Sequence, residues 1–155
     1  MRLLSDQELR ELFGVRAAIE AFAAGAAARR RDPAVMERLQ GLAGRMRGAV
    51  TQRDMAGYGR LAAEFHEALV GAGDNAILAG MYAQIRARLR RYQAAMSRVP
   101  ELPQTSIAEH DAILAAIAKG DAAAAMALTN AHLDSLVGQF AAPPKTKDDQ
   151  GRNTK

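Results

Sequence analysis

The chain has 155 residues, the size of one domain, and its 21 Lys and Arg against 17 Asp and Glu give a net charge of +4. A nucleic-acid binder usually carries a denser basic stripe, so composition gives no support for direct DNA binding. Cysteine is absent, which excludes disulfides and thiolate metal sites. No apolar run approaches the ~20 residues that span a bilayer, and no signal peptide opens the chain. We therefore expect a cytoplasmic protein without a membrane partner.

Helix signals follow one another along the whole chain. Alanine, the best helix former, is the commonest residue, aromatic residues make up only 5 % and there is no Trp, which favours an all-α fold. Capping signals and apolar residues at helical spacing predict six helices. They run from Ser5 to about Arg31, from Asp32 to about Gln52, from Asp54 to Gly71, from Asp74 to near Ser97, from Ser106 to Gly120, and from Asp121 to Phe140.

The helices should pack as one compact unit. Their connections are short, which predicts an antiparallel helical bundle. The clearest interior loop is the segment 100–103, Pro-Glu-Leu-Pro. Ser106 and Glu109 have the spacing of a capping box that would start the fifth helix. Residues 141–155 contain two prolines and then only polar or small side chains, so we expect a disordered polar tail there.

The three histidines all stand near the apolar faces of predicted helices. They are His66, His110 and His132. A single histidine in such a place is most simply a hydrogen-bonded core residue. Here all three histidines of the chain stand in such places. This supports a second interpretation, in which neutral imidazoles from facing helices meet around a metal ion. The spacing contains no local metal motif such as HExxH, so it leaves both interpretations open.

Two arginines and one glutamate are candidates for ligand binding. Arg16 and Glu20 lie four residues apart on the face that carries Leu12 and Ile19. They could form a simple intrahelical salt bridge, or Arg16 could point inward to clamp an anion with Glu20 setting its position. The fourth helix carries several arginines, which most simply form a solvated face. Arg86 follows Ile85 directly and could turn inward.

Four segments follow one another in a characteristic order along the chain: residues 12–20, 58–69, 75–78 and 106–121. This ordered set resembles a known family, the FCD domain of GntR-type bacterial transcriptional regulators. Residues 12–20 (LFGVRAAIE) are similar to its opening helix, residues 58–69 (YGRLAAEFHEAL) to its Phe-His helix, and residues 75–78 (NAIL) to the start of the next helix. Residues 106–121 match its Glu-His helix and the Gly-Asp turn that follows, and His132 occupies the position of the last family histidine. The resemblance covers about residues 7–140, with residues 1–6 as the remnant of a linker.

The resemblance implies a fold and a site. The fold is an antiparallel bundle of six to seven helices around a central cavity. Many members bind a divalent metal there through one Asp and three His, which would here include His66, His110 and His132. Zinc would be the expected ion, with nickel or manganese as alternatives. The family Asp stands one turn before the first histidine, where this chain has Ala62. We therefore expect metal binding that is weaker than usual or lost.

The resemblance also implies a function that is not enzymatic. The domain would sense a small carboxylate effector, held by the metal and by Arg16, Glu20 and Arg86, and it would form a homodimer. The family places a winged-helix domain before this one, and the chain shows none, so contact with DNA would need that absent domain. Two alternatives remain. A three-histidine zinc site could act as a hydrolase, and the chain could be a dimerisation partner of full-length regulators that binds no ligand.

Overall fold

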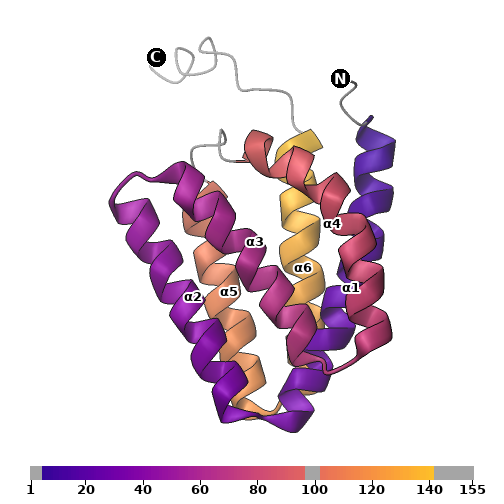
Figure 1. Ribbon diagram of the computed structural model, residues 1–155, viewed down its shortest axis with the longest axis vertical. Coiled ribbons are helices and arrows are strands. Elements are labelled where there is room, and N and C mark those ends of the chain that lie inside the picture. Colours follow the sequence, from indigo (N-terminus) through magenta and orange to yellow (C-terminus); the bar gives the residue numbers. More distant parts are fainter. Residues whose placement is uncertain (1–4, 97–101, 142–155) are drawn as a thin grey trace, which may run out of the picture.

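A computed structural model describes residues 5–96 and 102–141, and all of the regular structure in these ranges is helical (Figure 1). The prediction of an all-α fold is confirmed. The six helices are α1 (Asp6–Arg30), α2 (Pro33–Thr51), α3 (Met55–Ala72), α4 (Ala76–Met96), α5 (Leu102–Lys119) and α6 (Ala122–Ala141).

Most helix starts lie where the capping residues predict them. The side chain of Ser5 accepts from the backbone N–H of Glu8, and the Glu8 carboxylate accepts from the N–H of Ser5, which completes a capping box for α1. Asp32 caps α2 with Pro33 in its first turn, and Asp54 accepts from the N–H of Gly57 in α3. These side chains satisfy amides that have no partner inside the helix, so the boundaries are readable from sequence alone.

The start of the fifth helix differs from the prediction. Helix α5 begins at Leu102, so Ser106 lies inside it and is buried rather than capping its N-terminus. Glu109, predicted to reach back to Ser106, accepts a hydrogen bond from His132 instead. Pro103 lies in the first turn of α5, where proline is tolerated because the first amides need no intrahelical partner. The rest of the predicted loop, and the predicted tail beyond residue 141, fall outside the described residues.

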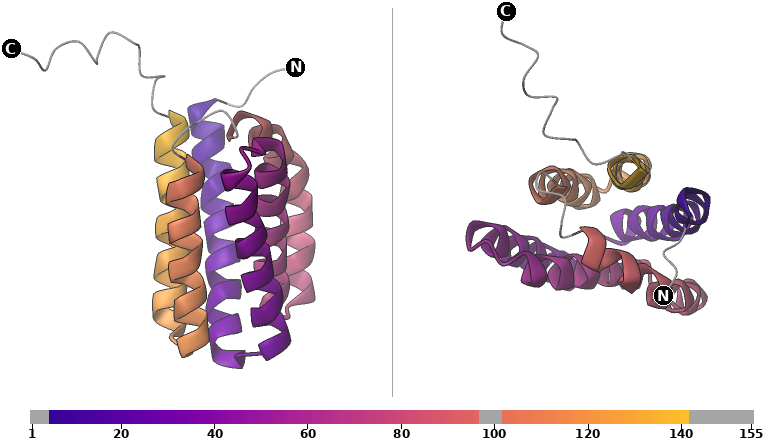
Figure 2. Two further views of the ribbon diagram at one scale, coloured as in Figure 1. Left: turned by 90° about the vertical axis from the view of Figure 1, so that its left-hand side faces the viewer. Right: turned by 90° about the horizontal axis from the view of Figure 1, so that it is seen from above.

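The six helices form a closed ring. Contacts join α1 to α6, α6 to α5, α5 to α2, α2 to α3, α3 to α4, and α4 back to α1. The view from above shows α2, α3 and α4 as one row and α5 with α6 as the opposite row, while α1 lies between α6 and α4 (Figure 2). Helix α1 also contacts α3 and α5 across the ring. Side chains on its inner face are thereby brought to the centre of the bundle.

The core is built largely from small side chains. Alanines of α1 are fully buried against α3, α5 and α6, and Gly25 of α1 lies directly against Met126 of α6. Gly120, between α5 and α6, has a φ of 76°, a left-handed conformation that glycine adopts without strain. Within the two described ranges, we find no helix with the length and apolar character needed to cross a bilayer.

Candidate metal centre

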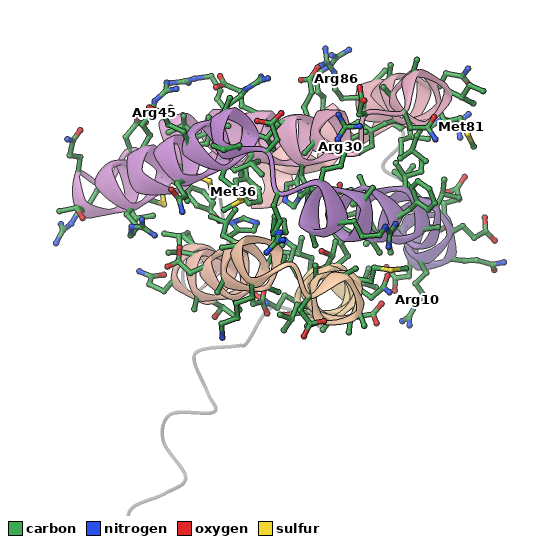
Figure 3. All side chains as sticks on the ribbon, turned by 90° about the horizontal axis from the view of Figure 1, so that it is seen from below. Arg10, Arg30, Met36, Arg45, Met81 and Arg86 are labelled. Carbon is green, nitrogen blue, oxygen red and sulfur yellow. The ribbon has the colours of Figure 1, made fainter. Side chains whose placement is uncertain are left out.

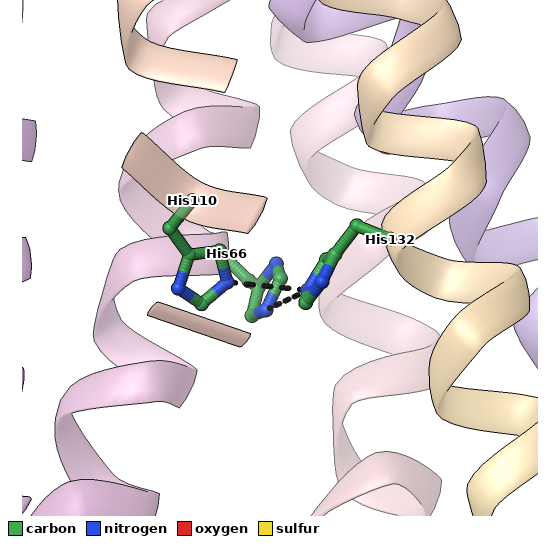
Figure 4. Close-up of side chains that lie close together, drawn as sticks. All are labelled: His66, His110 and His132. Carbon is green, nitrogen blue, oxygen red and sulfur yellow. Dashed lines mark hydrogen bonds between the residues drawn. The ribbon is translucent and has the colours of Figure 1, made fainter. Parts of the chain in front are cut away.

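The three histidines meet in the centre of the bundle. His66 comes from α3, His110 from α5 and His132 from α6, and their rings face one another (Figure 4). All three side chains are buried. The Nε2 atom of His132 lies 3.1 Å from Nε2 of His110 and 3.5 Å from Nε2 of His66. Three nitrogens that are far apart in sequence therefore converge on one point.

This arrangement fits a divalent metal ion. The three histidines each offer a ligand nitrogen, and these nitrogens all lie within 4.8 Å of one another. A tetrahedral zinc ion with Zn–N bonds of ~2.0–2.1 Å would hold its nitrogens ~3.3 Å apart, close to the observed separations. Within the described residues this group consists of histidines alone, so a bound ion would keep at least one position for another ligand.

Two carboxylates orient two of the three rings. Oε2 of Glu20 lies 2.6 Å from Nδ1 of His66, and Oε2 of Glu109 lies 2.6 Å from Nδ1 of His132. A carboxylate accepts, so each Nδ1 carries the proton and donates it, and each Nε2 keeps its lone pair for the centre. Carboxylate–histidine pairs of this kind hold the rings of metal-binding histidines in place.

Glu20 is also paired with Arg16, and both side chains are buried. Its second oxygen, Oε1, accepts from Nε of Arg16 at 2.6 Å, and the hydroxyl of Tyr82 interacts with both residues. Burial alone would raise the pKa of Glu20, but the charge of Arg16 and the contact with His66 outweigh it and lower the pKa to about 2. Glu20 is therefore ionised at neutral pH and compensates the buried guanidinium.

His66 and His110 are held in the neutral form, which is the form that binds metal. Burial lowers the pKa of His66 to about 4, and the charge of Arg16 acts in the same direction. Burial and the neighbouring imidazoles also lower the pKa of His110. The ring of His110 packs on Phe65, and its Nδ1 is buried without a hydrogen-bond partner. Its Nε2–H therefore donates to Nε2 of His132 as long as no metal takes that place.

The sequence-predicted residues divide into two groups. The structure brings together His66, His110, His132, Arg16 and Glu20. Arg86 does not join them, because its side chain is 38 % exposed on the outside of α4, where it pairs with Glu67 of α3 (Figure 3). Ala62, one turn before His66, is half-buried and packs against the apolar core, and among the described residues no carboxylate takes part in the metal-binding group.

Three contributors to the site were missed in the sequence. Glu109 was interpreted as a capping residue, although its position beside His110 was a signal that it lies near the site. Tyr82 contacts the Arg16–Glu20 pair, and Phe65 packs on His110. Neither aromatic residue differs from an ordinary core residue in the helical pattern, so no local signal distinguished them.

Comparisons with known proteins agree with the helical fold. A family model described as "FCD domain" matches residues 11–135, most of the chain. No curated protein matches the sequence significantly. A solved structure described as Streptococcus agalactiae GntR is similar, with a TM-score of 0.71 and 22 % identity. The match covers 90 % of this chain and 63 % of that one, so this chain spans less than two thirds of it. At this identity the likeness shows a shared fold.

Proposed function

Because the chain belongs to the FCD domain family, we propose that it is the ligand-sensing and dimerisation domain of a GntR-type transcriptional regulator in the cytoplasm. The observation that carries this proposal is the convergence of three buried imidazole nitrogens in the centre of the bundle. A sensor needs a site that can distinguish a ligand from water. Neutral histidines aimed at one point supply such a site once a metal ion binds.

The ion we propose is Zn²⁺, bound by His66, His110 and His132. The three proposed ligands are neutral and Ala62 adds no carboxylate, so no negative group within the described residues would bind the ion directly. A small carboxylate ligand would occupy an open position on the ion and supply the missing negative charge. The charge of the buried guanidinium of Arg16 is already compensated by Glu20, so Arg16 would contribute to effector binding as a hydrogen-bond donor.

Effector binding would act through the helices that carry the site. The three histidines lie on α3, α5 and α6, and the Arg16–Glu20 pair lies on α1. A ligand that binds one arrangement of these helices better than another shifts the population toward that arrangement. In a full regulator, the shift would change the spacing of two DNA-binding domains across the dimer.

Calorimetric titration tests this function. Zinc-loaded protein should bind at least one member of a panel of acetate, lactate, malate and gluconate, and the chelator-treated protein should bind it more weakly. Zinc at 100 times its Kd should raise the free energy of unfolding by about 2.7 kcal/mol. If no carboxylate bound, with or without zinc, the sensor proposal would fail. Absence of zinc binding alone would favour a dimerisation partner without a ligand.

The hydrolase alternative has no support from the geometry. A zinc hydrolase needs a general base that can reach the metal-bound water. Among the described residues, Glu20 and Glu109 are the carboxylates in contact with the histidine cluster, and each already accepts a hydrogen bond from a ring Nδ1–H. Their arrangement orients metal ligands, which is the role a sensor requires.

A further inference from the structure

The two carboxylate–histidine pairs differ in what lies behind the carboxylate. Behind His66, Glu20 is fully buried, and its second oxygen is held by Nε of Arg16. Behind His132, the side chain of Glu109 is 26 % exposed, and among the described residues no arginine forms an ion pair with it. Among the described residues, one carboxylate is thus held at both oxygens, while the other is held at one.

The hydrogen-bond chain that contains Arg16 has only one possible order. The Nε–H of an arginine can only donate, so the atom facing it must accept. An ionised carboxylate accepts at both oxygens, so it also accepts from the ring on its other side. The proton of a neutral His66 must then sit on Nδ1, and the lone pair must sit on Nε2, which faces the other two rings.

We propose that Glu20 is the positioning residue that sets the tautomer of His66, and that Arg16 fixes the orientation of the group at position 20, so that only a group that accepts from both Arg16 and His66 keeps the Nε2 lone pair of His66 free for a metal ion. This inference rests on the metal site of the proposed function. It goes beyond that function because it gives Arg16 and Glu20 a task that precedes any effector. It also predicts that the two pairs differ. Zinc binding at full affinity needs the carboxylate of Glu20, whereas glutamine can replace Glu109.

Replacing each glutamate by glutamine, which has the same shape, distinguishes the roles of Glu20 and Glu109. In Glu20→Gln, the amide oxygen must face Nε–H of Arg16, because it is the only acceptor of the amide. The amide NH₂ then faces His66 and donates to Nδ1, which drives the ring proton to Nε2 and blocks the metal-facing lone pair. In the matched control Glu109→Gln, the amide is free to turn its oxygen toward His132, which keeps its tautomer.

The first measurement is the tautomer of each ring in the metal-free protein, from long-range ¹H–¹⁵N NMR correlations. We expect the wild type to carry protons on Nδ1 of His66 and His132 and on Nε2 of His110. Glu20→Gln should move the proton of His66 to Nε2, and Glu109→Gln should leave that of His132 in place. A wild-type His66 protonated on Nε2 would overturn the proposal without any variant, and so would an unchanged tautomer in Glu20→Gln.

The second measurement is a rescue, read out by zinc titration. Glu20→Gln should weaken zinc binding by about 10–100-fold, the usual effect of losing a partner behind a metal-binding histidine. In the double variant Arg16→Met/Glu20→Gln, no arginine constrains the amide, so its oxygen can turn to His66 and zinc affinity should recover. A merely structural role for the pair predicts the opposite, since a second core substitution would weaken binding further.

The outcomes separate this inference from the proposed function. A wild-type protein that binds no zinc contradicts the metal site, while its tautomers and those of Glu20→Gln still test the role of Glu20. A wild-type protein that binds zinc, combined with a double variant no better than the single one, contradicts the role of Glu20 and leaves the metal site intact.

Discussion

The sequence offered two arginines as candidates for effector binding, and the structure pairs each with a glutamate in opposite environments. Arg16 and Glu20 lie in the centre of the bundle, with side chains 6 % and 0 % exposed. Arg86 and Glu67 lie on its surface, with side chains 38 % and 52 % exposed. The chemical groups are the same, but water screens the outer pair, whereas the inner pair is buried. The comparison teaches that burial, rather than residue type, decides how strongly the two charges of an ion pair interact.

The largest expected effect comes from breaking the inner pair. Glu20→Ala leaves the guanidinium of Arg16 buried without a countercharge, and we expect it to lower the free energy of unfolding by about 3–5 kcal/mol. The matched surface change, Glu67→Ala, should cost less than about 1 kcal/mol. Urea unfolding of both variants measures the difference, and equal costs would contradict the assignment of inner and outer pairs.

Lowering the pH should reduce the free energy of unfolding of the metal-free protein, through the buried His66 and Glu20. The pKa of His66 is about 4 in the folded state against 6.5 in a free chain, so the unfolded state binds more protons between these values. Stability therefore falls as the pH drops from 6.5 to 4, by about 3 kcal/mol for this residue. Glu20, with a folded pKa of about 2 against 4.5, adds a further loss below pH 4.5.

Urea unfolding with a chelator present, at pH 7.5 and at pH 4.5, measures this loss. In a His66→Asn variant the pH dependence between these points should be smaller, because one of the buried neutral rings is gone. A wild-type stability that rose on acidification would show that the rings are not held neutral by burial.

Restoring a carboxylate at the site should have an intermediate effect. Ala62→Asp places an acid one turn before His66 on the same face of α3, where it could become a fourth metal ligand. We expect zinc affinity to rise about tenfold, equivalent to about 1.4 kcal/mol, and carboxylate binding to weaken because the open position is filled. Zinc and carboxylate titrations measure both. Glu64→Asp, which places the same acid two residues before His66 and on the opposite side of α3, is the matched control and should leave zinc affinity unchanged.

The smallest effect should follow a change in the outer pair. Arg86→Gln should alter the free energy of unfolding by less than about 1 kcal/mol and should leave zinc and carboxylate binding at the wild-type level. The same measurements used for the inner pair apply. A marked loss of carboxylate binding in this variant would show that Arg86 belongs to the effector site, in contradiction to its exposed position on the surface.

The sequence by itself determined the helices and most of their ends. Apolar spacing is a property of neighbouring residues, and a capping side chain such as Ser5, Asp32 or Asp54 bonds to amides within its own first turn. The same local logic gave the wrong start for α5, because Ser106 is buried inside the bundle and the helix extends back to Leu102. The histidines, Arg16 and Glu20 were singled out because polar side chains on apolar faces need partners.

Only the tertiary structure decided which partners those are. His66, Glu20 and His132 come from three helices, and whether their atoms meet depends on how the ring of helices closes. The same closure turned Glu109 toward His132 and left Arg86 in water. The physical reason is that helix formation is settled within a few residues, whereas burial and hydrogen bonding of a side chain depend on segments brought together only by folding.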